Sequence, residues 1–341
     1  MKAARLHSYR SPLSLDDVST PVPEPGQVLV KVAGAGFCHS DIHVIDGEID
    51  LPLPLPLTLG HENAGHVAAI GRGVTTVREG DAVIVYGGWG CGTCGPCATG
   101  HEQLCDRPQW AGLSQWNGGY AEDILVPKER YLVKLSKLDP RRAAPLADAA
   151  LTPYRAIKKA LPFLEPDYKA LVIGVGGLGQ YGLKLLRLLS GCEIIAVDTS
   201  DEKLKLARRE GAAHALNGRD PKLLEKILEL TGGGVCAAFD FVVSDQTLAA
   251  AISSTRAMGK VTQIGLAGGA ANLKVLKNSR FEVTFEATLW GTLKELREVV
   301  ALAESGRLSL EETEFAPLER INEVCARLKR GEVTGRLVMT P

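Results

Sequence analysis

The stretch LVIGVGGLGQYGLKLLRLL, residues 171–189, decides the fold of this chain. Gly174, Gly176 and Gly179 have the spacing G-x-G-x-x-G, between a short apolar run and an amphipathic segment. A strand that turns sharply into a helix presents free amide groups at the helix N-terminus, where a diphosphate binds. The first glycine permits the tight turn, the second lets backbone approach the pyrophosphate, and the third lets the helix pack on the strand. The stretch therefore predicts a dinucleotide-binding Rossmann unit.

The next predicted strand indicates which dinucleotide is bound. It ends at Asp198, and a carboxylate at this position accepts hydrogen bonds from the ribose hydroxyls and repels a 2′-phosphate. This favours NAD over NADP. Lys203 follows one helical turn later, within reach of the same ribose, and Gly177 and Leu178 complete the phosphate loop. The pattern leaves open that the glycines serve only a tight turn and that Asp198 only caps a helix.

The chain changes character near residue 151, which divides it into two predicted domains. Downstream, apolar runs alternate with helix-length segments, as in a parallel sheet with crossover helices. We expect strands at 170–173, 194–197, 239–243 and 261–265, and a helix at 203–210. Upstream, short apolar runs such as 28–32 and 82–85 lie between Gly, Pro and Asp, which indicates β-structure.

Two further segments complete this outline. The Pro–Leu alternation of residues 51–60 predicts an extended connection, because proline lacks the amide hydrogen that a central strand donates. Near the C-terminus, apolar residues at helical spacing predict two amphipathic helices, followed by a strand over 336–339. These residues are Leu293, Leu296 and Val300 in the first helix, and Leu318, Ile321, Cys325 and Leu328 in the second.

Composition excludes several classes of function. The 341 residues fit about two domains, and 45% hydrophobic with 23% charged residues is typical of a globular protein. With 39 basic and 40 acidic side chains the net charge is −1, which argues against nucleic acid or a membrane as partner. No apolar run of about 18 residues is present to span a bilayer, and the N-terminal MKAARLHSYR does not resemble a signal peptide. We therefore expect a cytoplasmic protein.

Four of the eight cysteines are gathered in the loop 91–105. They are Cys91, Cys94, Cys97 and Cys105, with the spacing C-x2-C-x2-C-x7-C. Four thiolates so close together can surround one tetrahedral Zn²⁺ at about 2.3 Å, and such a closed site stabilises the fold without binding substrate. An iron–sulfur cluster or a redox pair is the less favoured alternative, because the last gap differs from that of bacterial ferredoxins. Cys192, Cys236 and Cys325 are expected to be small buried apolar side chains.

Two segments contain side chains that bind metals and move protons. GFCHSDIH contains Cys38, His39, Ser40 and His43, and LTLGHENAGH contains His61 and Glu62. Taken singly, each of these residues is more often a core or surface residue than a ligand. Together with the dinucleotide loop, the four-Cys loop and GGYAE at 118–122, the two segments resemble the zinc-dependent medium-chain alcohol dehydrogenases. The resemblance covers essentially the whole chain.

This resemblance implies a catalytic zinc held by Cys38, His61 and Asp148. The family usually has Cys at the third position, and Asp148, in PLADAALTPYRA, is a departure that some bacterial members share. A carboxylate suits Zn²⁺ at about 2.0–2.2 Å, although Asp148 is also suited to capping a helix. Glu62 corresponds to the acid that exchanges onto the zinc as a fourth ligand.

The resemblance also implies a proton path and further cofactor contacts. Ser40 and His43 correspond to a relay that takes the alcohol proton by way of the ribose hydroxyls, and imidazole, with an ordinary pKa of about 6.5, suits its end. Thr152 corresponds to a residue against the nicotinamide, and Arg336 to one that reaches the pyrophosphate. His39 lies where several relatives carry a phosphate-contacting Arg.

The implied activity is the reversible, NAD-dependent oxidation of secondary and primary alcohols to ketones and aldehydes, by hydride transfer from a zinc-bound alkoxide. Two zinc ions per chain are expected, one catalytic and one structural. A polyol or sugar dehydrogenase of the same family, and a non-catalytic nucleotide-binding relative, are the alternatives.

The implied fold class is α/β, with a Rossmann domain over 150–289 inserted into a partly closed, GroES-like β-barrel domain. The latter is formed by 1–149 and 290–341, and the active site is expected in the cleft between the two domains. VTFEATLWG, at 283–291, resembles the family's dimerising edge strand and pocket lining. Trp290, Trp89 and Trp116 are candidate pocket walls. We expect a homo-oligomer, a tetramer rather than a dimer.

Overall fold

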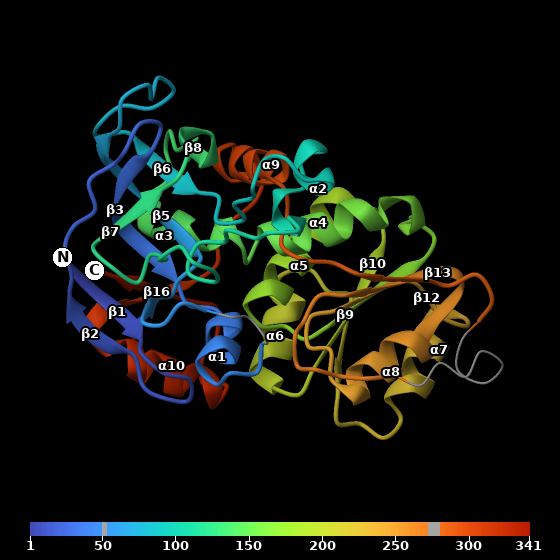
Figure 1. Ribbon diagram of the computed structural model, residues 1–341. Coiled ribbons are helices and arrows are strands. Elements are labelled where there is room, and N and C mark those ends of the chain that lie inside the picture. The colour runs from blue at the N-terminus through green and yellow to red at the C-terminus, as the bar shows by residue number, and fades with distance from the viewer. Residues whose placement is uncertain (50–52, 272–279) are drawn as a thin grey trace. The chain divides into compact units, whose positions relative to one another are not determined.

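A computed structural model of the protein describes residues 1–49, 53–271 and 280–341 (Figure 1). The described residues form two compact units. Unit 1 combines Met1–Leu151 with Trp290–Pro341, and unit 2 is the continuous segment Thr152–Leu289. Leu51 and Pro52, at the start of the predicted Pro–Leu connection, lie outside the described residues.

Unit 2 is built on one six-stranded parallel sheet in the order β11-β10-β9-β12-β13-β14. Counted from β9, this is the strand order 3-2-1-4-5-6 of a doubly wound dinucleotide-binding fold. Its strands are β9 (Lys169–Ile173), β10 (Glu193–Asp198), β11 (His214–Asn217), β12 (Val235–Asp240), β13 (Thr255–Gln263) and β14 (Thr284–Ala287). Its helices are α4 (Leu151–Ala160), α5 (Gly177–Leu189), α6 (Asp201–Arg209), α7 (Leu223–Thr231) and α8 (Asp245–Ser254), with a 3₁₀ turn at Leu161–Phe163.

The core of unit 2 lies where the central strands meet the crossover helices. Leu171 and Ile173 of β9 pack in one cluster with Ile195 of β10 and Ile252 of α8. Every residue of β12 is buried, as expected for a strand covered on both faces. This burial makes the sheet a rigid support for the loops at its carboxyl edge.

Unit 1 contains a three-stranded sheet, β2-β1-β4, and a seven-stranded sheet in which β15-β16-β3-β5-β6-β8 are ordered and β7 pairs with β3. Its strands are β1 (Lys2–Leu6), β2 (Ser14–Asp17), β3 (Val28–Gly36), β4 (Leu57–Thr58), β5 (Glu62–Ile70), β6 (Ala82–Val85), β7 (Asp123–Val126), β8 (Leu132–Lys134), β15 (Thr313–Pro317) and β16 (Arg336–Thr340). Its helices are α1 (His39–Ile45), α2 (Gly95–Ala98), α3 (Pro140–Ala143), α9 (Leu293–Glu304) and α10 (Ile321–Lys329). Its 3₁₀ turns are Glu102–Leu104, Glu129–Tyr131, Ala144–Ala147 and Leu318–Arg320.

The central pair of unit 1 is β3 with β5, which run antiparallel and approach each other closely. A Cβ atom at Gly65 would lie 1.9 Å from the carbonyl oxygen of Lys31, so only glycine fits there. The pairing places Gly36, at the end of β3, opposite Glu62, at the start of β5. It therefore brings the two segments GFCHSDIH and LTLGHENAGH to the same end of the sheet.

The predicted strand over 239–243 is wrong at both ends, because β12 covers Val235–Asp240. The Asp240 carboxylate accepts hydrogen bonds from the amides of Val242 and Val243, both at 2.9 Å, and Val243 has a φ of 62°. These bonds turn the chain directly after Asp240. The apolar letters that follow therefore belong to a loop.

Most other predicted elements are present with shifted ends. The helix expected over 203–210 begins two residues earlier, at Asp201, because the hydroxyl of Ser200 accepts from the amide of Lys203 and caps it. In α5, Tyr181 and Leu185 are buried, as expected for the apolar face of an amphipathic helix. Among the described residues, no helix is both long enough and apolar enough to cross a bilayer.

Candidate active site and metal centres

Four potential metal ligands converge at one end of the β3–β5 pair. They are Cys38, His61, Glu62 and Asp148, all buried, with their ligand atoms within 4.8 Å of one another. Cys38 lies between β3 and α1, His61 directly precedes β5, and Asp148 follows the 3₁₀ turn at 144–147. The Asp148 Oδ2 atom is 3.7 Å from Cys38 Sγ and 3.5 Å from His61 Nε2. The carboxylate of Asp148 therefore faces the other two predicted ligands.

The ionisable groups of this cluster have pKa values that depart from their ordinary values. Burial raises the pKa of the Cys38 thiol, and burial likewise raises the pKa of Glu62 to about 7. Burial lowers the pKa of His61, but the neighbouring charge of Asp41 and a hydrogen bond to Asp148 outweigh it, so this pKa lies well above its ordinary value. A thiolate, an imidazole and a carboxylate are the donor set that Zn²⁺ prefers, so a bound Zn²⁺ fits this cluster.

Asp41 and Tyr120 support the cluster, and sequence reasoning missed both. Asp41 Oδ2 accepts the Cys38 amide at 3.1 Å and the Tyr120 hydroxyl at 2.6 Å. Asp41 Oδ1 lies 3.3 Å from His61 Nδ1, the ring nitrogen that points away from Asp148. Burial, followed by the charge of Asp41, raises the pKa of Tyr120 well above its ordinary value, so its hydroxyl keeps its proton. The only sequence signal for Asp41 is its place three residues after Cys38, in the first turn of α1.

Arg336 is bound to Glu62. Its Nη2 atom donates to both carboxylate oxygens of Glu62, and both side chains are buried. Burial lowers the pKa of the guanidinium, but the neighbouring charges, that of Glu62 first, outweigh it, so this pKa lies above its ordinary value. The family resemblance implies a contact between Arg336 and the pyrophosphate of the cofactor. In the structure the guanidinium of Arg336 is paired with the carboxylate of Glu62.

The three remaining polar residues of GFCHSDIH lie on α1. Ser40 Oγ is 3.7 Å from Cys38 Sγ. His43 Nδ1 lies 2.5 Å from Glu48 Oε2, while His39, the first residue of the helix, is exposed. The structure therefore places Ser40 beside Cys38, a member of the cluster of potential ligands, and His43 one helical turn further along α1.

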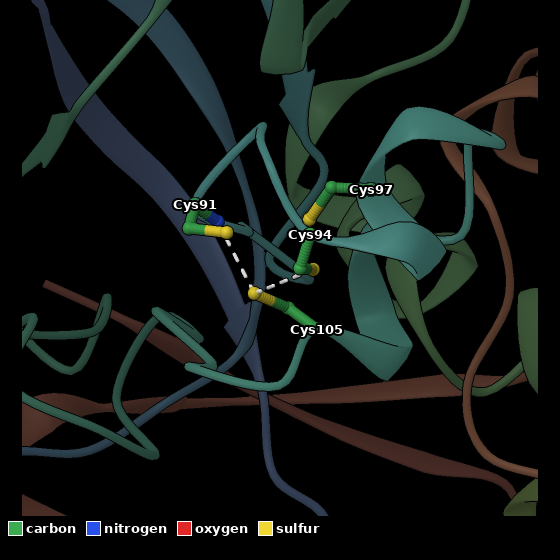
Figure 2. Close-up of side chains that lie close together, drawn as sticks. All are labelled: Cys91, Cys94, Cys97 and Cys105. Atoms are coloured by element: carbon green, nitrogen blue, oxygen red, sulfur yellow. Dashed lines mark hydrogen bonds between the residues drawn. The ribbon is translucent and has the colours of Figure 1, made fainter.

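The four cysteines of the loop 91–105 form the second cluster (Figure 2). Their sulfur atoms lie within 4.8 Å of one another, and Cys94 Sγ is 3.7 Å from Cys105 Sγ. Sulfurs bound to one tetrahedral Zn²⁺ are about 3.8 Å apart, given Zn–S bonds of about 2.3 Å. Cys105 Sγ also accepts amide hydrogen bonds from Cys91 (3.2 Å) and Arg107 (3.3 Å), which stabilise a thiolate. The loop thus has the geometry and the donors of a closed zinc site.

The glycines of the dinucleotide loop differ in what surrounds them. Gly174 has a φ of 89°, which only glycine adopts easily, and it follows β9 directly. A Cβ at Gly179 would lie 1.8 Å from the Gly174 carbonyl oxygen, whereas a Cβ at Gly176 would meet nothing within 4 Å. Gly176 precedes α5, and Gly177 and Leu178 are its first residues. The space beside Gly176 is therefore free for a ligand, and a diphosphate fits there.

Asp198 lies at the carboxyl end of β10, next to this loop. Its Oδ2 accepts the Val175 amide at 2.7 Å and its Oδ1 accepts the Ser200 amide at 2.9 Å. Because each carboxylate oxygen has two lone pairs, both retain capacity for ribose hydroxyls. Lys203 lies in the first turn of α6, and Thr152 is buried in α4.

Trp290, one of the predicted pocket tryptophans, packs against a member of the ligand cluster. The Trp290 ring meets the His61 ring edge-on at 5.5 Å between centroids, and Trp290 Nε1 donates to the Ala147 carbonyl. Trp110, which sequence reasoning missed, packs against Trp290 at 6.3 Å. Trp89 is fully buried and packs instead against Trp116.

The comparisons with known proteins agree with this geometry. The sequence matches the family models described as "Alcohol dehydrogenase GroES-like domain" over residues 24–137 and "Zinc-binding dehydrogenase" over 177–305. It is 37% identical to an NAD-dependent alcohol dehydrogenase of Sulfurisphaera tokodaii and 35% identical to a D-arabinose 1-dehydrogenase (NADP(+)) of Saccharolobus solfataricus. These alignments cover 100% of this chain and 100% and 97% of those proteins. The structure of the alcohol dehydrogenase from Aeropyrum pernix superposes with a TM-score of 0.93 at 39% identity, with 100% of both chains covered. The predicted fold class is thereby confirmed.

Proposed function

Because this chain belongs to the zinc-dependent medium-chain alcohol dehydrogenase family, we propose that it oxidises secondary and primary alcohols to ketones and aldehydes with NAD, and catalyses the reverse reaction. The observation that carries the proposal is the buried cluster of Cys38, His61, Glu62 and Asp148. Burying four polar side chains together costs folding free energy unless a bound ion or another partner compensates them. Their burial at one point therefore supports a metal-binding function.

We assign one zinc ion to Cys38, His61 and Asp148, with Glu62 as the exchangeable ligand, and a second to the four-Cys loop. Zinc at the first site supplies a Lewis acid that makes an alcohol hydroxyl more acidic. Ser40, two residues from Cys38, is then the group that accepts the alcohol proton, and His43 is the end of the relay. Glu48, on His43 Nδ1, holds the imidazole in one orientation.

NAD is assigned to the loop of Gly174, Gly176, Gly177, Leu178 and Gly179, with Asp198 on the ribose. The cofactor accepts the hydride, and the protein positions and selects it. The Asp198 carboxylate repels a 2′-phosphate, which supports NAD rather than NADP. Lys203 is assigned to the ribose from its place one helical turn after Asp198, and Thr152, His39 and Arg336 are assigned to cofactor binding on family resemblance alone.

A sugar or polyol dehydrogenase is the second candidate, favoured by the 35% identity to the D-arabinose 1-dehydrogenase. That relative is named for NADP(+), whereas Asp198 here selects against a 2′-phosphate. The aromatic side chains of Trp290, which packs on His61, and Trp110, which packs on Trp290, also suit an apolar substrate better than a polyhydroxylated one.

The test is NADH or NADPH formation at 340 nm over a panel from ethanol through 2-butanol and cyclohexanol to sorbitol and D-arabinose. Turnover of simple alcohols with NAD, abolished by a zinc chelator, is the expected result. Activity confined to sorbitol or D-arabinose favours the second candidate. Absence of turnover on every substrate by protein with both zinc sites filled contradicts the proposal.

We further propose a cytoplasmic homotetramer in which subunits form dimers through the edge strand β14. In the described part of unit 2, β14 ends the sheet, and its burial pattern is largely exposed. Phe281 and Met258 near this edge are 71% and 68% exposed, which supports an interface there. Eight free cysteines suit a reducing compartment.

A further inference from the structure

Tyr120 belongs to the motif GGYAE, residues 118–122, to which the proposed function gives no role. Its side chain is fully buried, and its ring stacks on Phe37 with centroids 5.4 Å apart. Its amide donates to the Leu59 carbonyl at 3.0 Å, and its carbonyl accepts from the Ala4 amide at 2.7 Å. The hydroxyl group of Tyr120 is therefore held in a fixed position.

This hydroxyl lies between two acceptors, 2.6 Å from Asp41 Oδ2 and 3.1 Å from the Gly36 carbonyl oxygen. A phenol has one proton to donate. Hydrogen bonds to an ionised carboxylate are shorter and stronger than those to a neutral carbonyl. Tyr120 therefore donates to Asp41.

Asp41 is fully buried and only its Oδ2 is hydrogen-bonded, while Oδ1 and the facing His61 Nδ1 have no other hydrogen-bond partner among the described residues. Its Oδ2 accepts from the Tyr120 hydroxyl and, at 3.1 Å, from the Cys38 amide. With two donors on Oδ2, the carboxylate is fixed so that Oδ1 faces His61 Nδ1 at 3.3 Å. A carboxylate at Nδ1 selects the imidazole tautomer that leaves Nε2 free to bind a metal.

We propose that Tyr120 is a positioning residue of the metal site formed by Cys38, His61 and Asp148. Its hydroxyl fixes the Asp41 carboxylate, and the carboxylate orients His61. This inference rests on the proposed function, which assigns zinc to that cluster. Mutation of a residue that hydrogen-bonds to a metal-bound histidine typically lowers metal affinity about 10–100-fold. Because Tyr120 acts through Asp41, we expect the lower end of this range.

The test is Tyr120→Phe, which removes the hydroxyl and keeps the ring on Phe37. In the zinc-loaded enzyme, a chromogenic chelator is expected to remove zinc from the Cys38 site about tenfold faster than in the wild type. Zinc in the four-Cys loop is expected to leave at the wild-type rate. Asp148→Ala, which lacks the first site, assigns the two release phases.

The matched control is Tyr131→Phe. Tyr131 is also buried, but its hydroxyl accepts from Arg130 Nη2 at 2.8 Å and makes no contact with Asp41. This variant is expected to release zinc from the Cys38 site at the wild-type rate. Asp41→Asn supplies the second test, because Tyr120→Phe is expected to add little in the Asp41→Asn background.

Three results overturn the inference: wild-type release from Tyr120→Phe, equal acceleration of both phases, or full additivity with Asp41→Asn. If Tyr120→Phe does not fold, wild-type zinc release from Asp41→Asn overturns it by itself. A wild-type protein that retains zinc only in the four-Cys loop contradicts the proposed function instead. The two failures are therefore distinguishable by the metal content of the wild type.

Discussion

At the scale of single residues, Asp148 is where this chain departs from the usual family ligand. Its Oδ2 lies 3.7 Å from Cys38 Sγ and 3.5 Å from His61 Nε2. These distances support a role for Asp148 as a metal ligand and not only as a helix cap. A carboxylate carries the same charge as the thiolate that it replaces, so the charge of the donor set is conserved.

We predict that Asp148→Ala lowers the zinc content from about two to about one per chain and abolishes turnover, because two protein ligands hold a catalytic zinc poorly. Metal analysis after dialysis, with the same preparation assayed for activity, measures both effects. Asp139→Ala, which alters the partly exposed N-cap of α3, is the control and should keep both metals. A variant of Asp148 with two zinc ions and full turnover would exclude Asp148 as a ligand.

Asp240 is a buried acid with a consequence for stability at different pH values. Burial raises its pKa, although the amides of Val243 and Val242 oppose the shift. The folded-state pKa thus lies above the unfolded value of 3.8, so the contribution of Asp240 to stability is complete below that pH. As pH rises through the folded-state pKa, this contribution is lost, because the unfolded chain ionises more readily.

We therefore predict that Asp240→Asn, which keeps an oxygen acceptor for the two amides, removes this loss. The free energy of unfolding of the variant should exceed that of the wild type by a margin that increases from pH 4 towards neutrality. Urea denaturation at several pH values measures the margin. Asp245→Asn, in the exposed first turn of α8, is the control. A margin that shrinks as pH rises contradicts the prediction.

At the scale of elements, Gly176 and Gly179, between β9 and the first turn of α5, are needed for different reasons: Gly179 for helix packing and Gly176 for ligand space. We predict that Gly179→Ala destabilises unit 2 by about 1–3 kcal/mol, because its Cβ would lie 1.8 Å from a backbone oxygen. Gly176→Ala should change stability by at most about 1 kcal/mol but weaken NAD binding at least about tenfold, since its Cβ enters the space assigned to the diphosphate. Chemical denaturation and fluorescence titration with NADH separate the two effects. Equal NAD affinity in Gly176→Ala and the wild type would place the pyrophosphate elsewhere.

The strand order of the unit 2 sheet also determines whether Cys192 and Cys236 can form a disulfide. Their sulfurs are 3.9 Å apart, but Cys236 is in β12, Cys192 directly precedes β10, and β9 lies between these strands. Because a whole strand lies between them, the backbones are more than one strand spacing of about 4.8 Å apart, and the 3.9 Å between the sulfurs is far above the about 2.05 Å of an S–S bond. We predict that both thiols stay free after mild oxidation of the folded protein. Differential alkylation with mass spectrometry measures this, and a Cys192–Cys236 disulfide peptide would contradict it.

The sequence predicts the parts of the fold and site that are local. The strand–turn–helix segment 171–189 and the cysteines of 91–105 are each local in the sequence, so spacing alone indicates their chemistry. Cys38 and His61 meet through the register of β3 with β5, which spacing does not reveal, and the prediction there depends on family resemblance. Arg336 and Glu62 are 274 residues apart, and Tyr120 and Asp41 are 79 apart. No local pattern connects such pairs, because sheet topology brings them together.

At the scale of the whole molecule, the edge strand β14 gives the proposed tetramer a test. We predict that Phe285→Lys, in the middle of β14, lowers the mass in solution, because a charge on an edge strand opposes pairing with another chain. Size-exclusion chromatography with light scattering measures the mass. Val22→Lys, at a side chain 84% exposed in unit 1, is the control. An unchanged mass for Phe285→Lys would place the interface elsewhere.

The order of synthesis follows from the way in which unit 1 is assembled from both parts of the chain. Unit 2 is one continuous segment and leaves the ribosome before β16, which pairs with β3 and carries Arg336. A nascent chain can thus complete the nucleotide-binding unit while Glu62 still lacks its guanidinium partner. The buried pair of Glu62 and Arg336 therefore forms only after the last strand is translated, so a ribosome that stalls before residue 336 yields a chain with an assembled sheet in unit 2 and an unfinished unit 1.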